Sequence, residues 1–303
     1  MGILFGLLTA LFWGSSDFLA RFSARRIGAL RTTLYMQLTG FVLLTIFLRW
    51  IGGWGHLADG SGWQPWAWGV LAGVLNGIAS LSLYRSFELG KMAVVAPISA
   101  SYPVLTVALS LLTGEHLTVL RVAGIVLTLT GVVLVAAGEN SPNKMSAELS
   151  AIGTSPATEA AGKKAGSGVG WAFLSALGFG VLFWLLGTRV VPSVGYAATV
   201  WMIRLTSSLL TVVVIVVLRQ PLALPRGGLV PAWLLGMGLL DTGAFVLNNR
   251  GMQLEQVSVV SVLASLYGAF TVALAAIFLR EKLSPGQWLG IVAIFAGIVL
   301  ISR

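Results

Sequence analysis

The 303-residue chain has no cysteine and few charged residues. Without cysteine, neither a disulfide framework nor a thiolate metal site can form. Only 10% of the residues are charged, whereas roughly a quarter are charged in a soluble domain. Hydrophobic residues make up 57%, and the mean hydropathy is +0.92. An ordinary soluble domain is therefore excluded, because so few charged side chains cannot give a chain of this size a polar surface.

Acidic residues are the scarcer charged class, with 10 Asp and Glu against 19 Lys and Arg. The net charge of +9 would suit a nucleic-acid-binding protein, but the sequence offers no soluble basic face, and we expect no nucleic-acid partner. In so apolar a chain the basic residues are expected to fix the orientation in a membrane instead, since Lys and Arg accumulate in cytoplasmic loops.

Apolar runs of about 20 residues recur along nearly the whole chain. Each run can cross the ~30 Å hydrocarbon core as a helix, and none shows the alternation of a β-barrel strand. The first run precedes its positive charges, so we interpret it as a retained helix and not as a signal peptide. The sequence predicts an all-α membrane protein with ten transmembrane helices, at about 2–20, 32–50, 66–86, 92–112, 118–137, 170–190, 196–218, 231–250, 257–279 and 285–302.

Residues 138–168 differ from the rest, being polar and rich in Gly, Ser and Ala, which predicts a flexible polar linker. The linker separates residues 1–137 from residues 169–303, and each part holds five apolar runs. At an offset of 165 or 166 the two parts match at charged, aromatic and glycine positions, so that Tyr102 falls on Tyr267. This self-similarity predicts two repeats of a five-helix unit.

Five spans per unit is an odd number, so the second unit must start on the opposite side of the membrane from the first. Inverted repeats of this kind let many secondary transporters alternate their access between the two sides. Duplication within a structural protein is the alternative. By our count, thirteen Lys and Arg lie on the side of the 138–168 linker and five on the other. The charge distribution therefore predicts a multi-pass plasma-membrane protein with a cytoplasmic linker and both termini outside.

Several short motifs point to a known family. They are Ala-Leu-Phe-Trp-Gly-Ser-Ser at 10–16, Gly-Lys-Met-Ala-Val-Val-Ala-Pro at 90–97, Tyr-Pro-Val at 102–104, Gly-Glu-His-Leu at 114–117 and Arg-Glu-Lys-Leu at 280–283. In their order and spacing they resemble the EamA family of the drug/metabolite transporter superfamily, over all of the chain except the linker. The resemblance implies a ten-helix carrier with a cavity lined by helices 1, 3, 4, 6, 8 and 9. It also implies export of amino acids or other small metabolites, in some members against a proton gradient.

Two features depart from the family pattern. Members are usually drawn with both termini in the cytoplasm, which is opposite to the charge count. The first unit carries Pro97 and Pro103 in its fourth span, whereas the second unit has Val262 and Gly268 at the matching positions. Proline inside a helix removes a backbone hydrogen bond. We therefore expect a gating helix break at Pro97 and Pro103, and no equivalent break in the second unit.

Ionisable residues inside membrane spans are costly and are functional candidates by default. Three lie deep in the predicted spans: Asp17, Arg204 and Asp241. Asp241 matches Asn76 of the first unit, which predicts one shared polar site at the middle of the membrane. Arg204 is placed to pair with Asp241, either as a substrate contact or as a structural ion pair. Asp17 is expected to bind a proton and a cationic substrate in turn, or else to lie at the interface with Arg21.

Aromatic residues complete the predicted site. Trp13 matches Phe179, and Tyr102 matches Tyr267, so these rings are expected to hold an apolar or cationic substrate, with core packing as the alternative. The two histidines lie in loops or at span ends, so no metal or cofactor is expected. No P-loop is present, which argues against ATP-driven transport by this chain alone.

The leading hypothesis is a secondary exporter of a small metabolite such as an amino acid, whose amino and carboxylate groups would pair with Asp and Arg together. The second hypothesis is a proton-coupled antiporter of organic cations that uses Asp17. The remote third is an intramembrane aspartyl protease, because Asp241-Thr242-Gly243 spells the protease tripeptide. The expected partners are the lipid bilayer, a small-molecule substrate, protons in the second hypothesis, and a second copy of the chain if a homodimer forms.

Overall fold

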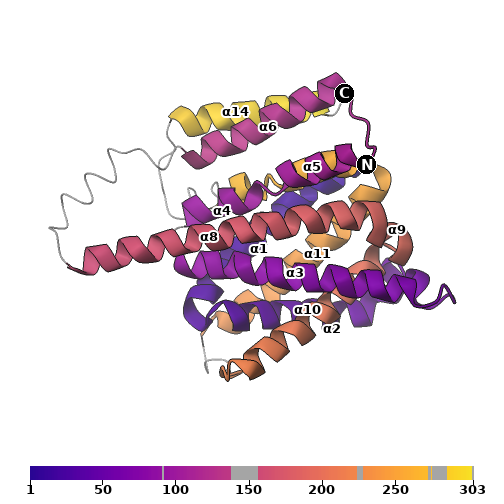
Figure 1. The fold of residues 1–303 in the computed structure, drawn as a ribbon, viewed down its shortest axis with the longest axis horizontal. Coiled ribbons are helices and arrows are strands. Elements are labelled where there is room, and N and C mark those ends of the chain that lie inside the picture. The colour runs from indigo at the N-terminus through magenta and orange to yellow at the C-terminus, as the bar shows by residue number, and fades with distance from the viewer. Residues whose placement is uncertain (91, 138–155, 224–227, 272–273, 275–284, 302–303) are drawn as a thin grey trace.

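The structure is a computed structural model that describes residues 1–90, 92–137, 156–223, 228–271, 274 and 285–301. Every regular element within these ranges is a helix (Figure 1). The long helices are α1 (Gly2–Ile27), α2 (Ala29–Ile51), α3 (Gln64–Leu89), α8 (Pro156–Leu185), α10 (Tyr196–Val217) and α11 (Val230–Leu254). The shorter ones are η1 (Gly55–Leu57), α4 (Met92–Ala100), α5 (Pro103–Leu112), α6 (Val119–Ala137), a π-helical turn η2 (Leu186–Val190), α9 (Val191–Val194), α12 (Val257–Ala264) and α14 (Pro285–Ile301).

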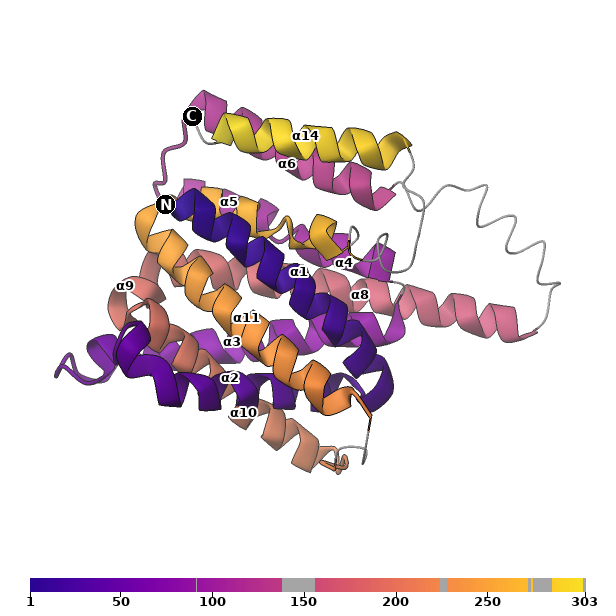
Figure 2. The same cartoon turned by 180° about the vertical axis from the view of Figure 1, so that it is seen from behind.

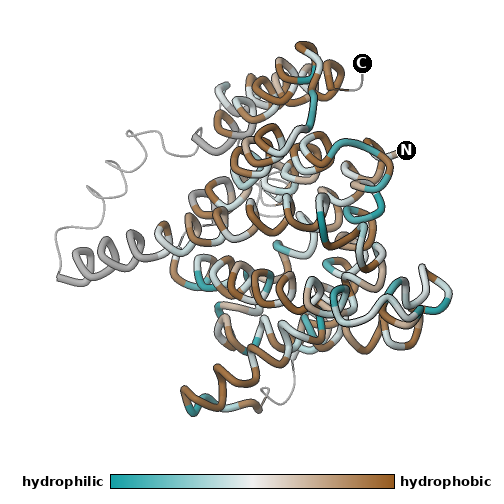
Figure 3. Tube along the Cα trace, turned by 45° about the vertical axis from the view of Figure 1, so that its right-hand side comes forward, coloured by the Kyte–Doolittle hydropathy of each residue, from teal (hydrophilic) through white to brown (hydrophobic). Residues whose placement is uncertain are grey.

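Six helices in the described ranges are long and apolar enough to cross a membrane, and four shorter apolar helices lie in the remaining predicted runs. Many of their outward side chains are large and apolar, for example Val42, Ile46, Leu209 and Val213. In Figure 3 hydrophobic residues run along the helices, while hydrophilic ones gather mainly at helix ends and loops. Apolar outer surfaces of this kind suit contact with lipid tails.

The helices form one bundle, with α6 and α14 side by side along one edge and α2 and α10 toward the opposite edge (Figures 1 and 2). Between these edges, α1 packs against α11 and α3 packs against α8. Small residues allow the close approach. A Cβ added at Gly131 would lie 2.6 Å from the carbonyl oxygen of Gly290, and one added at Gly124 would lie 2.8 Å from that of Gly297. The residue in contact on α14 has a higher number when the residue on α6 has a lower one, so α6 and α14 run antiparallel.

Two spans are interrupted near the middle, and one of these breaks was not expected. The first separates α4 from α5 at residues 101–102, and the second follows α12 at residues 265–266, after which residues 267–271 are helical again. The prediction of a break in the first unit only is therefore wrong. A serine accompanies each break: Ser101 Oγ donates to the carbonyl of Ile98 (2.7 Å) and Ser265 Oγ to that of Val262 (2.8 Å). Such a bond competes with the helical one.

The prolines have different positions relative to the first break. Pro103 is the first residue of α5, where its fixed φ suits a helix start. Pro97 lies inside α4, and its side chain is outside the described part of the chain. The break therefore falls at Pro103 and not at Pro97.

The flexible linker is shorter than predicted, because α8 begins at Pro156. Residues 156–168 were assigned to the linker by composition, but they contain four alanines, a glutamate and two lysines, which are good helix formers, after a proline at the first position. Residues 138–155 of the predicted linker lie outside the described residues.

Candidate functional site

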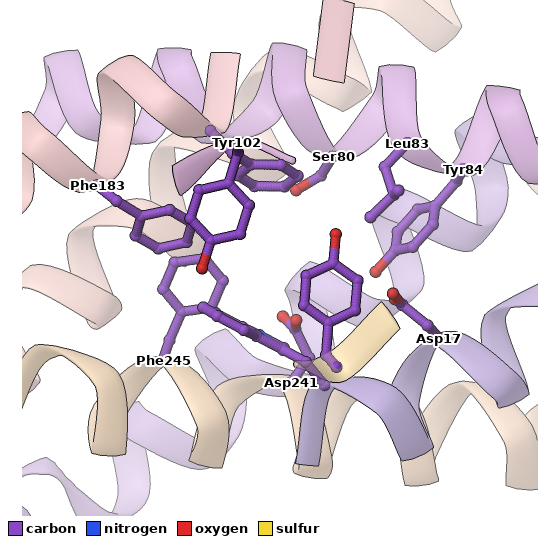
Figure 4. Close-up of a pocket in the computed structure, with 11 residues that line it drawn as sticks. Asp17, Ser80, Leu83, Tyr84, Tyr102, Phe183, Asp241 and Phe245 are labelled. Atoms are coloured by element: carbon purple, nitrogen blue, oxygen red, sulfur yellow. The ribbon is translucent and has the colours of Figure 1, made fainter. Parts of the chain in front are cut away.

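A cavity lies at the centre of the bundle, with an empty volume of about 360 Å³ that includes the solvent space at its mouth. Its walls come from α1, α3, α8 and α11, which are the first, third, sixth and eighth predicted spans. The two helix breaks, in the fourth and ninth predicted spans, complete the walls. The lining residues are Trp13, Asp17, Ser80, Leu83, Tyr84, Tyr102, Phe179, Phe183, Asp241, Phe245 and Tyr267 (Figure 4).

Six of the eight residues predicted for the site line this cavity: Trp13, Asp17, Tyr102, Phe179, Asp241 and Tyr267. The other two, Asn76 and Arg204, are fully buried behind the wall. Five lining residues were not predicted for the site, although the repeat register contained a signal for three of them. Ser80 and Phe245 match each other at the offset of 165, and each lies four residues after a predicted site residue. Phe183 is the repeat match of Asp17.

The cavity has an acidic end and an aromatic end (Figure 4). Asp17 and Tyr84 lie together at one end, while Phe183 and Phe245 lie at the other. The Trp13 ring centroid is 5.3 Å from that of Phe183 and 5.2 Å from that of Phe245. Tilted and edge-on rings at such distances attract one another and leave π-faces that suit apolar or cationic groups.

The two ends point to different sides of the bundle. Asp17 is toward the C-terminal end of α1, which Arg25 ties to the end of α3 through the carbonyl of Gly90 (3.1 Å). Phe245 is toward the C-terminal end of α11, where Gly2 packs against Gly251. The acidic end therefore faces the α1–α2 turn, and the aromatic end faces the side that holds the start of α1.

Arg204 and Asp241 form the predicted ion pair, with 2.6 Å between Nη2 and Oδ2. Arg204 Nη1 also donates to Gln37 Oε1 at 2.6 Å, and its guanidinium lies 4.9 Å from the centroid of the Phe245 ring. Helices α2, α10 and α11 thus meet at one guanidinium. A carboxylate on the cavity wall is compensated from behind by a cation that itself has no exposed surface.

Asn76 occupies the matching position in the first unit, but its chemistry differs from that of Asp241. Its Nδ2 donates to Ser207 Oγ at 3.2 Å, and Ser207 Oγ donates to the carbonyl of Gly73 at 2.7 Å. These bonds join α3 to α10 without charge. The predicted shared polar site is therefore divided, with a neutral link in one unit and an ion pair in the other.

Asp17 is 5% exposed, and the structure shows no ion pair or hydrogen bond to its carboxylate from any residue within the described ranges. In particular, no ion pair joins it to Arg21, the interfacial alternative suggested by the sequence. An ionised carboxylate in such a place needs a partner, because burial without one is strongly unfavourable. A bound proton or a bound cation provides that partner.

The geometry argues against the protease alternative. An aspartyl protease needs two carboxylates that share a proton, but Asp241 is paired with Arg204. No group of three His, Cys, Asp or Glu side chains that could hold a metal ion occurs among the residues with described placement.

Comparisons with known proteins agree with this architecture. The sequence pattern of the EamA-like transporter family matches the chain in two parts, residues 1–137 and 166–303. An uncharacterized protein of Methanocaldococcus jannaschii is 32% identical over 136 residues, which are 44% of this chain and 95% of that protein. A protein of known crystal structure, 18% identical, has a similar fold with a TM-score of 0.70, covering 99% of this chain and 95% of the other. The chain belongs to the EamA-like transporter family, and it is a multi-pass membrane transporter and not an enzyme.

Proposed function

We propose that the protein is a secondary active transporter that moves a small organic cation in exchange for protons, with Asp17 as the site at which the two compete. The observation that carries the proposal is the uncompensated carboxylate of Asp17 at one end of a cavity whose other end is aromatic. A substrate with an amine at one end and an apolar or aromatic group at the other matches both ends. Export is the direction that the family resemblance implies.

The same geometry argues against the amino acid as the preferred substrate. That hypothesis requires a cation to bind the substrate carboxylate, and Arg204 was the residue expected to do so. Arg204 does not line the cavity, and Asp241 and Gln37 already contact its guanidinium. The described lining residues include no Lys or Arg. A zwitterion therefore finds a partner for its amine but not for its carboxylate.

The coupling follows from one carboxylate that serves two ligands. When a cation leaves, the buried Asp17 is stabilised by taking up a proton from the other side of the membrane. When the next cation arrives, the proton is released. Because proton and substrate cannot occupy the carboxylate together, a proton gradient drives the cation in the opposite direction.

Ten spans in two inverted repeats remain our proposal for the architecture, and the helix contacts support it. Thr106 Oγ1 donates to the carbonyl of Gly180 at 3.0 Å, and Thr271 Oγ1 donates to that of Gly14 at 3.3 Å. Each residue of one pair is the repeat match of a residue in the other. The half-length relative from Methanocaldococcus jannaschii also supports a five-helix unit that exists as a separate protein.

One side of the cavity carries two layers that we propose open and close during transport. The inner layer is the aromatic end. The outer layer is an ionic cluster in which Arg121 Nη1 lies 2.9 Å from Glu255 Oε1 and also bonds Gln256. It joins the first turn of α6 to the α11–α12 turn. Rocking of the two units has to separate these residues before substrate can leave on that side.

The proposed site for this cycle is the plasma membrane, with the 138–168 segment in the cytoplasm as the charge count predicts. The cysteine-free chain makes the orientation simple to test. Single cysteines introduced at exposed positions on opposite sides, Ser61 and Arg219, should react with an impermeant maleimide in intact cells only at Ser61. Reaction at Arg219 alone would contradict the orientation.

The function is tested with purified protein in liposomes that carry a pH gradient. We expect uptake of radiolabelled phenethylamine that depends on the gradient and is competed by tetraphenylphosphonium, while labelled phenylalanine is transported poorly. Asp17→Asn should abolish amine uptake. Efficient phenylalanine counterflow, with amine uptake unaffected by Asp17→Asn, would contradict the proposal.

A further inference from the structure

We propose that Arg204 determines the charge of the substrate: by pairing with Asp241 it leaves one carboxylate in the cavity, so that the transporter accepts monocations and excludes dications. The inference rests on the proposed function, because it assumes that a cation binds at Asp17. It assigns a specificity role to a residue that contacts no substrate and lies outside the cavity wall.

The cavity wall holds two carboxylates, Asp17 from α1 and Asp241 from α11. Figure 4 shows both directed into the same space. Two ionised carboxylates in one desolvated cavity would attract a divalent cation or a diamine more strongly than a monoamine, since complementary charge decides between such ligands.

Within the described residues, the fold places a cation against only one of these two carboxylates, that of Asp241. Arg204 reaches Asp241 at 2.6 Å, and Gln37 holds the other side of its guanidinium at 2.6 Å. Gly40 provides the space, because a Cβ at that position would lie 2.9 Å from Arg204 Nε. Asp17 has no such partner among the residues that the structure describes. The charges of Arg204 and Asp241 cancel, and the cavity keeps the single negative charge of Asp17.

In the first unit, the positions that correspond to Arg204 and Asp241 are neutral. Asn76 falls on Asp241 at the offset of 165, and Gln37 falls on Arg204 at an offset of 167, the spacing that also separates Gly28 and Gly195 before α2 and α10. The contacts of Asn76 are uncharged hydrogen bonds. The second unit thus carries an added positive and an added negative charge. An interhelical link at this depth does not need charge, as the bond from Asn76 to Ser207 between α3 and α10 shows. The charged pair therefore has a role beyond packing, and its place at the cavity wall makes that role selection by charge.

The test compares the binding of phenethylamine, a monocation, with that of p-xylylenediamine, a dication of similar length, to purified protein at one pH. The wild type should prefer phenethylamine. Arg204→Gln should expose the second carboxylate and improve the ratio of diamine to monoamine binding by about tenfold or more. Arg204→Lys, which keeps the charge, should behave like the wild type. The double variant Arg204→Gln/Asp241→Asn should restore the preference for the monoamine, because one carboxylate remains.

Asp241→Asn provides a second measurement that does not depend on the folding of Arg204→Gln. It leaves Arg204 without its carboxylate, so that an uncompensated positive charge lies behind the cavity wall while the carboxylate of Asp17 remains on the wall. We expect its preference to move from phenethylamine toward the zwitterion phenylalanine by about tenfold.

The outcomes distinguish the inference from the proposed function. If wild-type protein binds phenethylamine but neither Arg204→Gln nor Asp241→Asn changes the ranking of ligands, Arg204 is structural and the inference is wrong while the proposed function stands. If the wild type binds no monocation, the proposed function and the inference are both wrong. A change of ranking in either variant, reversed by the double variant, supports the inference.

Discussion

The two units proposed for this transporter make matching helix contacts but differ in the residues that they direct toward the cavity. The packing is similar because each break approaches a glycine of the opposite unit, Gly14 in one case and Gly180 in the other. At the cavity, matching positions carry different chemistry, as in the pairs Asp17 and Phe183, Ser80 and Phe245, and Asn76 and Asp241. The shared packing suits a motion between two equivalent states. The differences give the cavity its acidic and aromatic ends.

The difference between the two units is tested most directly by making them alike at Asp17, which matches Phe183 of the second unit. Asp17→Phe introduces the residue of the second unit, and Asp17→Asn removes only the charge. Losing one partner of a desolvated ion pair costs about 3–5 kcal/mol. We therefore expect cation binding to weaken by about a hundredfold or more in both variants, measured by equilibrium binding of labelled phenethylamine.

A matched control for Asp17 is Asp59, in the exposed loop between α2 and α3. Hydrogen bonds from Ser61, followed by one from His56, lower the pKa of Asp59 to about 2, so it is ionised at any assay pH near neutrality. Asp59→Asn should leave binding unchanged. Equal losses from Asp17→Asn and Asp59→Asn would indicate a general effect of net charge and not a site.

The shared packing can be tested at the glycines. A Cβ at Gly14 would lie 2.9 Å from Phe270 Cβ and 3.0 Å from the carbonyl oxygen of Tyr267. A Cβ at Gly180 would lie 2.8 Å from Leu105 Cβ and 3.0 Å from the carbonyl oxygen of Tyr102. Overpacking of this kind costs about 1–3 kcal/mol. Gly14→Ala and Gly180→Ala should therefore lower thermal stability in detergent by similar amounts.

Gly170→Ala is the control for the glycine variants, because a Cβ at this exposed helical position meets nothing within 4 Å. Its stability should match or slightly exceed that of the wild type, since Ala favours helix over Gly. If only one of Gly14→Ala and Gly180→Ala is destabilising, the two units do not share their packing.

The ion pair of Arg121 and Glu255 lies on the aromatic side of the cavity, so its loss is expected to affect that side and not the acidic side. Arg121→Ala removes the pair with Glu255 and should destabilise closure of the aromatic side by about 1 kcal/mol or less, because the pair is partly exposed. A single cysteine at Ser258, beside this cluster, should then react faster with a water-soluble maleimide. A charge exchange, Arg121→Glu with Glu255→Arg, should restore slow labelling. Unchanged labelling in Arg121→Ala would remove this cluster from the gating proposal.

Much of the fold and part of the site could be predicted, because hydrophobic length and repeat register are properties of the sequence itself. The apolar runs marked the helices, and the register placed Tyr102 opposite Tyr267. Arg204 and Asp241 were paired correctly because unpaired charges are rare in membrane spans. The position of Arg204 behind the cavity wall could not be predicted, since whether a guanidinium faces a cavity or a neighbouring helix depends on the rotation of α10.

The second helix break shows why other features could not be predicted. It is accompanied by a hydrogen bond from Ser265 to the carbonyl of Val262, and serines in helices often make such bonds without a break, as Ser86 does in α3. The absent proline was a reasonable but misleading signal. Ser80 and Phe245 were overlooked for another reason, because serine and aromatic residues are common in membrane helices. Only their positions relative to Asn76 and Asp241 indicated that they face the cavity.

The smallest expected effect concerns the two matched hydrogen bonds. Thr106 Oγ1 bonds the carbonyl of Gly180 at 3.0 Å, and Thr271 Oγ1 bonds that of Gly14 at 3.3 Å. Each hydroxyl also bonds a carbonyl of its own helix, so the interhelical contribution is modest, about 0.6 kcal/mol on average in membrane proteins. Thr106→Val and Thr271→Val should each lower thermal stability slightly, and Thr106→Val by the larger amount because its bond is shorter. Additive losses in the double variant would indicate independent contacts, whereas a loss above the sum would show that the two interfaces are coupled, as a rocking motion shared by both units requires.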